Sequence, residues 1–181
     1  MDTPELVTFT LGPQLFGIPV LQVRDVLPLQ KIAVIPCAPA GVCGAVNLRG
    51  RIATAISLRH KFGLISSEDG QGMFIVVEHK GELYSLMVDS VGDVMHLSVE
   101  DFEPTPVNLD PLWQGTACGL FRLEGRLLVV LDVPRLLDLV HTSSPLPSTS
   151  AKATADAFSA ATRRNLGEAG SGGAGGGHHQ A

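Results

Sequence analysis

Three side chains in the middle of the chain are of the types that form a nucleophilic triad: Ser57, His60 and Asp89. A triad serine is usually presented on a sharp, glycine-flanked turn such as G-x-S-x-G, and no such pattern surrounds Ser57. His60, His79 and His96 stand alone, without the close spacing of metal-binding histidines. Up to residue 141 the chain has no G-x-G-x-x-G or G-x-x-x-x-G-K-[ST] loop that would hold phosphate groups. We therefore predict a protein that is not an enzyme and that uses no cofactor and no metal ion.

A second set of polar residues gathers at a predicted β-hairpin over residues 44–51. Apolar and polar residues alternate there, and Gly50 supplies the backbone freedom that a tight turn needs. This geometry places Asn47, Arg49 and Arg51 at or beside the tip. An arginine on a short, rigid turn suits docking on another protein, because few side-chain rotamers must be ordered on binding. The same arginine can equally serve only to solvate the turn.

The rest of the region from residue 5 to 141 is dominated by short runs with β-strand alternation, separated by glycine-containing turns. The predicted strands are 6–11, 15–20, 41–48, 51–56, 73–78, 83–88, 91–97, 116–123 and 126–131. Residues 20–27 carry apolar side chains at helix-like intervals and are predicted as a short helix or an irregular turn. One helical turn is expected over 58–62, and a last short helix over 133–139 with Asp132 as its cap. Many short strands and few helices predict a mainly all-β protein built from two small antiparallel barrels.

Composition narrows the class of partner. The chain has 181 residues, 45% hydrophobic and 5% aromatic, and a formal net charge of −5, which argues against nucleic-acid binding. The charge is uneven: residues 26–67 hold five bases and no acid (+5), whereas residues 68–110 hold ten acids and one base (−9). Such a distribution either orients charged partners or neutralises itself within the fold.

The chain divides into a short N-terminal lead (1–4), a folded domain (5–141) and a Ser/Ala/Gly-rich tail (142–181) predicted to be disordered. No apolar run is long enough to cross a membrane, and the N-terminus has no pattern of a secretory signal, so we expect a cytoplasmic protein without direct membrane insertion. Cys37, Cys43 and Cys118 form no C-x-x-C motif and have apolar or small neighbours. We therefore expect buried or half-buried free thiols.

Seven segments of the domain, in order and at matching intervals, resemble the CheW family of chemotaxis adaptors. They are Phe9-Thr10-Leu11-Gly12, Phe16-Gly17-Ile18-Pro19-Val20, Val23-Arg24-Asp25-Val26, Gly44-Ala45-Val46-Asn47-Leu48-Arg49-Gly50, Ser57-Leu58-Arg59 with Phe62, Met87-Val88-Asp89-Ser90-Val91-Gly92-Asp93-Val94, and Leu127-Leu128-Val129-Val130-Leu131-Asp132. The resemblance covers residues 6–139. It implies two five-stranded, SH3-like β-barrel subdomains around a shared core.

The resemblance also implies a function and a set of partner-binding residues. Proteins of this family are non-enzymatic couplers that join a CheA-type histidine kinase to the cytoplasmic tip of chemoreceptors, the methyl-accepting chemotaxis proteins. On the family pattern, receptor contact falls on Val20, Val23, Asp25, Gly44, Asn47 and Arg49. Kinase contact falls on the neighbourhood of Arg49, which includes Gly50, and on the segment that contains Val88, Asp89 and Val94.

Two features keep other interpretations open. Ser57 stands where the family usually has an aspartate, and this removes a possible partner for Arg51 or Arg59. A similar scaffold could serve a non-flagellar chemosensory pathway, such as one that controls pilus motility, or the chain could be a detached regulatory domain of a histidine kinase. We expect a separate adaptor, because the sequence contains neither a phosphate-accepting histidine region nor an ATP-binding domain.

Overall fold

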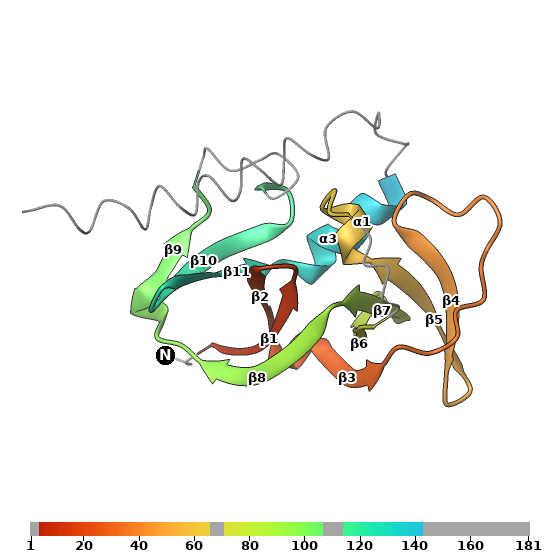
Figure 1. Ribbon diagram of the computed structural model, residues 1–181, viewed down its shortest axis with the longest axis horizontal. Coiled ribbons are helices and arrows are strands. Elements are labelled where there is room, and N and C mark those ends of the chain that lie inside the picture. The colour runs from red at the N-terminus through yellow and green to blue at the C-terminus, as the bar shows by residue number, and fades with distance from the viewer. Residues whose placement is uncertain (1–3, 66–70, 107–113, 143–181) are drawn as a thin grey trace, which may run out of the picture.

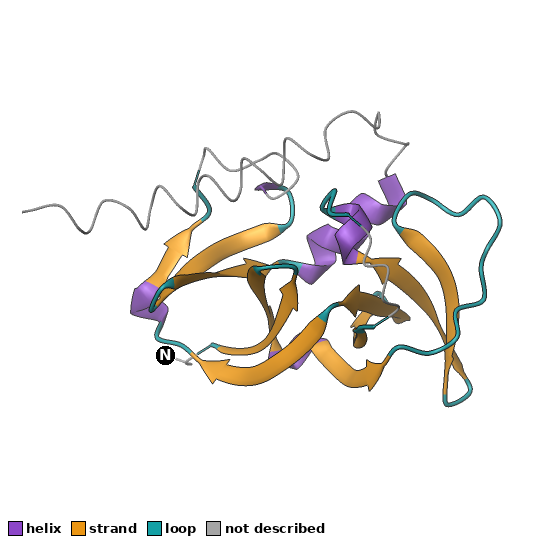
Figure 2. Ribbon diagram, in the orientation of Figure 1, coloured by secondary structure: helices purple, strands orange, loops and turns teal. Residues whose placement is uncertain are grey.

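A computed structural model describes residues 4–65, 71–106 and 114–142. The predicted tail, 142–181, lies almost wholly outside the described residues. The described chain forms two β-sheets with short helices between them (Figures 1 and 2).

The two sheets define two subdomains. The sheet of the first subdomain has six strands, in the order β8 (Ser90–His96), β1 (Glu5–Leu11), β2 (Gln14–Pro19), β11 (Arg126–Leu131), β10 (Ala117–Leu123) and β9 (Phe102–Pro104). The sheet of the second subdomain has five, in the order β3 (Val23–Pro28), β6 (Met73–His79), β7 (Glu82–Val88), β5 (Arg51–Ser57) and β4 (Val42–Leu48). The helices are α1 (Leu58–Lys61) and α3 (Val133–Thr142), and the 3₁₀ turns are η1 (Val20–Gln22) and η2 (Val99–Asp101).

Both subdomains repeat one arrangement. An edge strand is followed by a hairpin, a parallel neighbour and a second hairpin: β8-β1-β2-β11-β10 corresponds to β3-β6-β7-β5-β4. The edge strands are exchanged, because β3 follows β2 but joins the second sheet, and β8 follows β7 but joins the first. A helix follows the last hairpin in each half, α1 after β5 and α3 after β11. The predicted mainly β fold with two small subdomains is confirmed; two details differ, since the first sheet has six strands and each sheet contains one parallel pair, β2–β11 and β5–β7.

The hairpins form where the turn residues match the twist of the strands. In the β4–β5 hairpin, Leu48 pairs with Arg51, and the two loop residues Arg49 and Gly50 have φ angles of 53° and 88°. Positive φ at both loop positions is typical of a type I′ turn, which favours a right-twisted hairpin. The corresponding β10–β11 hairpin has a similar sequence, with Leu123-Glu124-Gly125-Arg126 in place of Leu48-Arg49-Gly50-Arg51.

The prediction for residues 20–27 was only partly right. The chain makes a 3₁₀ turn at η1 and then runs as strand β3, with Val26 opposite Ile75 and Leu27 opposite Phe74 of β6. The spacing of the valines fits a helix locally, but pairing with a neighbouring strand satisfies the backbone hydrogen bonds and decides the outcome. Strand β9 was not predicted at all.

A shared apolar core joins the subdomains. Phe9 and Phe16 of the first sheet stack with ring centroids 5.4 Å apart, and Phe62, directly after α1, stacks on Phe16 at 5.7 Å. The buried face of α3 and the inner faces of β6 and β7 complete this cluster. The prediction for the thiols was wrong at two of three positions: Cys37 and Cys118 are exposed, and only Cys43 is half-buried.

Candidate partner-binding surface

The tip of the β4–β5 hairpin is internally braced. The side-chain oxygen of Asn47 accepts a hydrogen bond of 2.7 Å from the backbone N–H of Gly50. Asn47 therefore holds the turn, and the side chain of Arg49 extends from a fixed backbone. A braced turn loses little conformational entropy when a partner binds it, which suits recognition.

The hairpin end presents two cations and an apolar side chain to solvent. Arg49 and Arg51 are exposed, and neither forms an ion pair with any residue that the structure describes. Ile52 beside them is 65% exposed. A recess lined by Arg51, Ile52, Thr54, Gly81, Glu82 and Leu83 opens where β5 and β7 begin. Unpaired arginines around an exposed apolar residue and a recess are typical of a protein-binding surface.

A second exposed region lies where the chain crosses between the sheets at η1. Leu21 is 93% exposed, whereas Val20 and Val23 are half-buried, and Val23 packs against the shared core. The carboxylate of Asp25 accepts a hydrogen bond of 2.9 Å from the backbone N–H of Val26. Val20, Val23 and Asp25 were predicted from the sequence as partner-binding residues, but Leu21 was not. Strand alternation within 15–20 gives no indication that the next apolar residue turns outward.

Gly44 has a structural reason of its own. Its φ is 148°, and a Cβ atom at this position would lie 2.2 Å from the carbonyl oxygen of Ala33. The loop between β3 and β4 lies against β4 at this point, where Ala33 and Ala45 exchange two backbone hydrogen bonds of 2.8 Å. Gly44 therefore allows this loop to lie on the second sheet beside the hairpin, and its own surface is buried.

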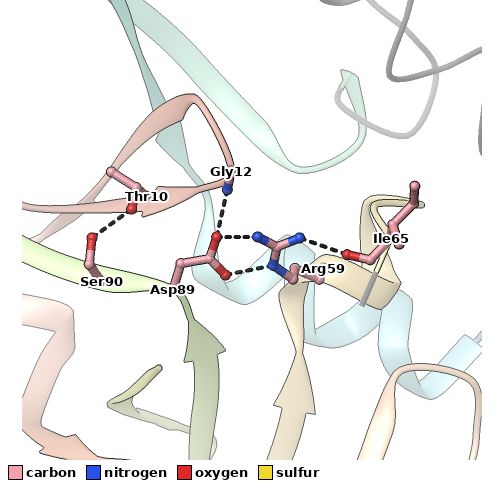
Figure 3. Close-up of polar contacts among 6 residues, drawn as sticks. All are labelled: Thr10, Gly12, Arg59, Ile65, Asp89 and Ser90. Atoms are coloured by element: carbon pink, nitrogen blue, oxygen red, sulfur yellow. Dashed lines mark hydrogen bonds and ion pairs between the residues drawn. The ribbon is translucent and has the colours of Figure 1, made fainter. Parts of the chain in front are cut away.

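Val88 and Asp89 lie at the crossing from β7 to β8. Val88 is 4% exposed and belongs to the shared core, which leaves almost none of its side chain for a partner. The carboxylate of Asp89 binds Nε of Arg59 at 2.6 Å, a second guanidinium nitrogen of Arg59, and the backbone N–H of Gly12 at 2.6 Å (Figure 3). Arg59 also donates to the carbonyl of Ile65 at 2.6 Å. Both oxygens of Asp89 are thus occupied within the chain.

The environment of this pair fixes its charge state. Partial burial favours the neutral form of Asp89, but hydrogen bonds from Arg59 and Gly12 outweigh it and leave the pKa of Asp89 below its usual value. The hydrogen bond to Asp89 raises the pKa of Arg59 above its already high value. The pair stays ionised at neutral pH. Arg59 therefore has a carboxylate partner in Asp89, even though position 57 is a serine and not an aspartate.

The same contacts do not assemble the triad that the residue types suggested. The hydroxyl of Ser57 accepts a hydrogen bond of 3.2 Å from the backbone N–H of His60 and so caps α1, and Asp89 is engaged by Arg59. In the described ranges, no three or more His, Cys, Asp and Glu side chains are grouped so that they could hold a metal ion. No helix in those ranges is long and apolar enough to cross a membrane.

The surface of the first subdomain around β8 and η2 has the opposite charge. Among the described strands β8 is an edge strand that pairs with β1, and its Val94 is 47% exposed beside the exposed Asp93. Glu100 and Asp101 of η2 follow, and neither forms an ion pair within the described chain. The β4–β5 hairpin and strand β9 lie at opposite ends of the long axis of the molecule (Figure 1). The molecule therefore carries a basic end with Ile52 and an acidic end with exposed apolar residues of its own.

A fold of two small β subdomains that share a core and expose large apolar side chains is typical of a protein-interaction module. The model of the CheW-like domain matches residues 5–141, so this chain belongs to the CheW-like family. It is similar to the chemotaxis protein CheW of Klebsiella aerogenes, 33% identical over 74% of this chain and 81% of that protein. It is also similar to CheW of Treponema pallidum, 31% identical over 73% of this chain and 81% of that protein.

A solved structure agrees with the fold. The scaffolding protein TtCheW of Thermoanaerobacter tengcongensis superposes with a TM-score of 0.68 and 26% identity, covering 74% of this chain and 92% of that one. The resemblance inferred from the sequence motifs is confirmed. The chain is a chemotaxis adaptor of the CheW family.

Proposed function

We propose that this chain couples the cytoplasmic tip of chemoreceptors to a CheA-type histidine kinase and catalyses no reaction itself. The observation that carries this proposal is the presence of separate exposed surfaces on one fold with a shared core. One surface is apolar, around η1 and β3; another is basic, around the β4–β5 hairpin; a third is acidic, around β8. A coupler needs at least two surfaces that can be occupied at once, and it needs no reactive group.

The receptor contact is assigned to η1 and β3 and, on the family pattern, to the β4–β5 turn. Leu21 offers an apolar anchor on a short turn, and Val20 and Val23 extend the apolar surface beside it. Asp25 of β3 adds a negative charge beside this apolar surface. A central apolar anchor with charged margins is the usual composition of a specific interface.

The kinase contact is assigned to the ends of the subdomains. The basic hairpin end offers Arg49, Arg51 and the recess beside Ile52, and the β8 edge offers Val94 and Asp93. Because these surfaces carry opposite charges, the chain can discriminate between complementary and like-charged faces of a partner. Asp89 contributes by holding the start of β8 in place.

Coupling requires that receptor state change the relative stability of two kinase states. An adaptor contributes to this difference when it binds more tightly to one state of the receptor or of the kinase than to the other. Such binding needs well-formed surfaces and no reactive group.

The hairpins provide a matched test of the assignment. Arg51 and Arg126 follow the turn glycine at corresponding positions of the β4–β5 and β10–β11 hairpins, and both are exposed without an ion pair in the described chain. We expect Arg51→Ala and Arg49→Ala to weaken binding to the kinase or receptor tip, measured by titration calorimetry, and Arg126→Ala to leave it unchanged. All three variants should melt like the parent, since exposed arginines add little stability. Equal effects of Arg51→Ala and Arg126→Ala would contradict the assignment.

One relative points to a different pathway. The chain is 29% identical to the protein PilI of Pseudomonas aeruginosa, over 68% of this chain and 70% of that protein. A scaffold in a non-flagellar chemosensory pathway is therefore the second candidate. Parallel pull-downs against each CheA-type kinase of the host would separate the two, because the pathway is identified by the kinase that is retained.

A further inference from the structure

We propose that Arg59 and Asp89 form a positioning pair that fixes the orientation of the first subdomain relative to the second. The pair thereby aligns the binding surfaces that the two subdomains carry. The part of this inference that concerns partner binding rests on the proposed function; the part that concerns orientation does not.

The pair joins three segments that belong to different subdomains. Arg59 lies on α1, which continues β5 of the second subdomain, and Gly12 lies in the β1–β2 turn of the first. Asp89 lies between them, where the chain leaves β7 and enters β8 (Figure 3). Its carboxylate accepts from Arg59 and Gly12, and its backbone N–H donates to the carbonyl of Thr10 at 3.1 Å. One residue therefore bonds to both subdomains.

The contact has the geometry of a directional clamp. Two guanidinium nitrogens of Arg59 face the two oxygens of Asp89, a bidentate arrangement that constrains angle as well as distance. The two side chains are only 23% and 24% exposed, so water and salt weaken the pair less than a surface pair. The third contact of Arg59, to the carbonyl of Ile65, fixes the guanidinium on its other side.

The shared core does not make this clamp redundant. Apolar contacts stabilise close approach but have little directional preference, and packed layers can slide by small shear movements. The stacked rings of Phe16 and Phe62, which join the first sheet to α1, are such a contact. Hydrogen bonds between charged groups can select one orientation among several that the core would accept.

A corresponding contact in the other half of the molecule provides the control. There α3, which continues β11 of the first subdomain, reaches the β6–β7 turn of the second. Asp138 binds Nζ of Lys80 at 2.8 Å and Nε2 of His79 at 3.3 Å. The side chains of Asp138 and Lys80 are 54% and 70% exposed, so solvent screens this contact. It likewise links the helix of one half to the other subdomain, but it lacks the shielding of the Arg59–Asp89 pair.

Two native cysteines allow the orientation to be measured on the full chain. Cys37 is exposed in the β3–β4 loop of the second subdomain, and Cys118 is exposed on β10 of the first. With Cys43→Ala as the parent, spin labels on these two thiols report the distance between subdomains by double electron–electron resonance. We expect Asp89→Asn and Arg59→Lys to broaden or shift the distance distribution, because the first removes the charge and the second removes the fork. Asp138→Asn should leave the distribution as in the parent.

The outcomes separate this inference from the proposed function. An unchanged distribution in folded Asp89→Asn and Arg59→Lys would overturn it. So would global unfolding of both, seen by circular dichroism, because the pair would then support the fold as a whole. The distance measurement contains no receptor or kinase. Its result is therefore independent of whether the chain binds these partners. With receptor tip and kinase added, Asp89→Asn should reduce the three-component complex more than it reduces either pairwise affinity.

Discussion

Gly44→Ala tests how closely the loop before the binding hairpin is held against the second sheet. A Cβ atom at Gly44 would lie 2.2 Å from the carbonyl oxygen of Ala33, which is a backbone atom and cannot rotate away. Relief requires that the loop move off β4, and both hydrogen bonds between Ala33 and Ala45 would then be lost. Alanine must also adopt the unfavourable φ of 148°.

The expected cost follows from these two changes. Two backbone hydrogen bonds at about 1 kcal/mol each and about 1 to 3 kcal/mol of backbone strain give about 3 to 5 kcal/mol. Gly50→Ala is the control, since its φ is also positive, at 88°, but no atom of the described residues lies within 4 Å of the added Cβ. That variant has only the cost of the left-handed backbone, about 1 to 2 kcal/mol.

Thermal and urea unfolding of both variants provide the assay. At about 4 °C for each kcal/mol, the melting temperature should fall by about 12 to 20 °C for Gly44→Ala and by about 4 to 8 °C for Gly50→Ala. If Gly44→Ala is no more destabilising than Gly50→Ala, the loop does not depend on the close approach at Gly44 and the reasoning is refuted.

Three further predictions concern single polar groups. The hydroxyl of Ser85 is buried with no hydrogen-bond partner in the described structure. Ser85→Ala should therefore raise the free energy of unfolding, measured by urea titration, by about 1 kcal/mol. A clear fall in this free energy would contradict the prediction. The pKa of Asp89 is lowered in the folded state, so the stabilisation by its charge is present above about pH 4 and is lost as the pH falls through the folded pKa. The difference in unfolding free energy between the parent and Asp89→Asn should therefore shrink in acid. A difference that is constant with pH would exclude a role for the charge. Burial, with a contribution from Glu82, raises the pKa of Tyr84 to about 12, and Tyr84 is the one tyrosine of the chain. The absorbance of the tyrosinate band should therefore have its titration midpoint at about pH 12 in the folded protein and at about pH 10 in urea. A midpoint at about pH 10 in the folded protein would be inconsistent with the buried position.

The elements that the sequence predicted well are those with local causes. Glycines at turn positions and alternating apolar residues located both β4–β5 and β10–β11, and Asp132 caps α3 as expected, accepting from the backbone N–H of Arg135 at 3.0 Å. Strand β3 was missed because its apolar spacing fits a helix until β6 is beside it. Strand β9 is three residues long and ends at a proline, which is too short for alternation to indicate a strand.

The site residues divide in the same way. Exposure of Arg49 at a turn tip follows from local geometry, and so does the role of Asn47 as an acceptor within the turn. The contact between Arg59 and Asp89 spans 30 residues and depends on the exchange of strands between the sheets, which no local pattern contains. Exposure of Leu21 depends on the same exchange, since its position is decided by where η1 crosses between the subdomains.

The most direct test of the adaptor role is a three-component sedimentation assay. Vesicles that carry the cytoplasmic receptor domain are mixed with the cognate CheA-type kinase, with and without this chain. We predict that the kinase sediments with the vesicles only when the chain is present, and that the amount falls with Arg51→Ala but not with Arg126→Ala. Sedimentation of the kinase that does not depend on the chain would contradict the claim that this protein couples the two.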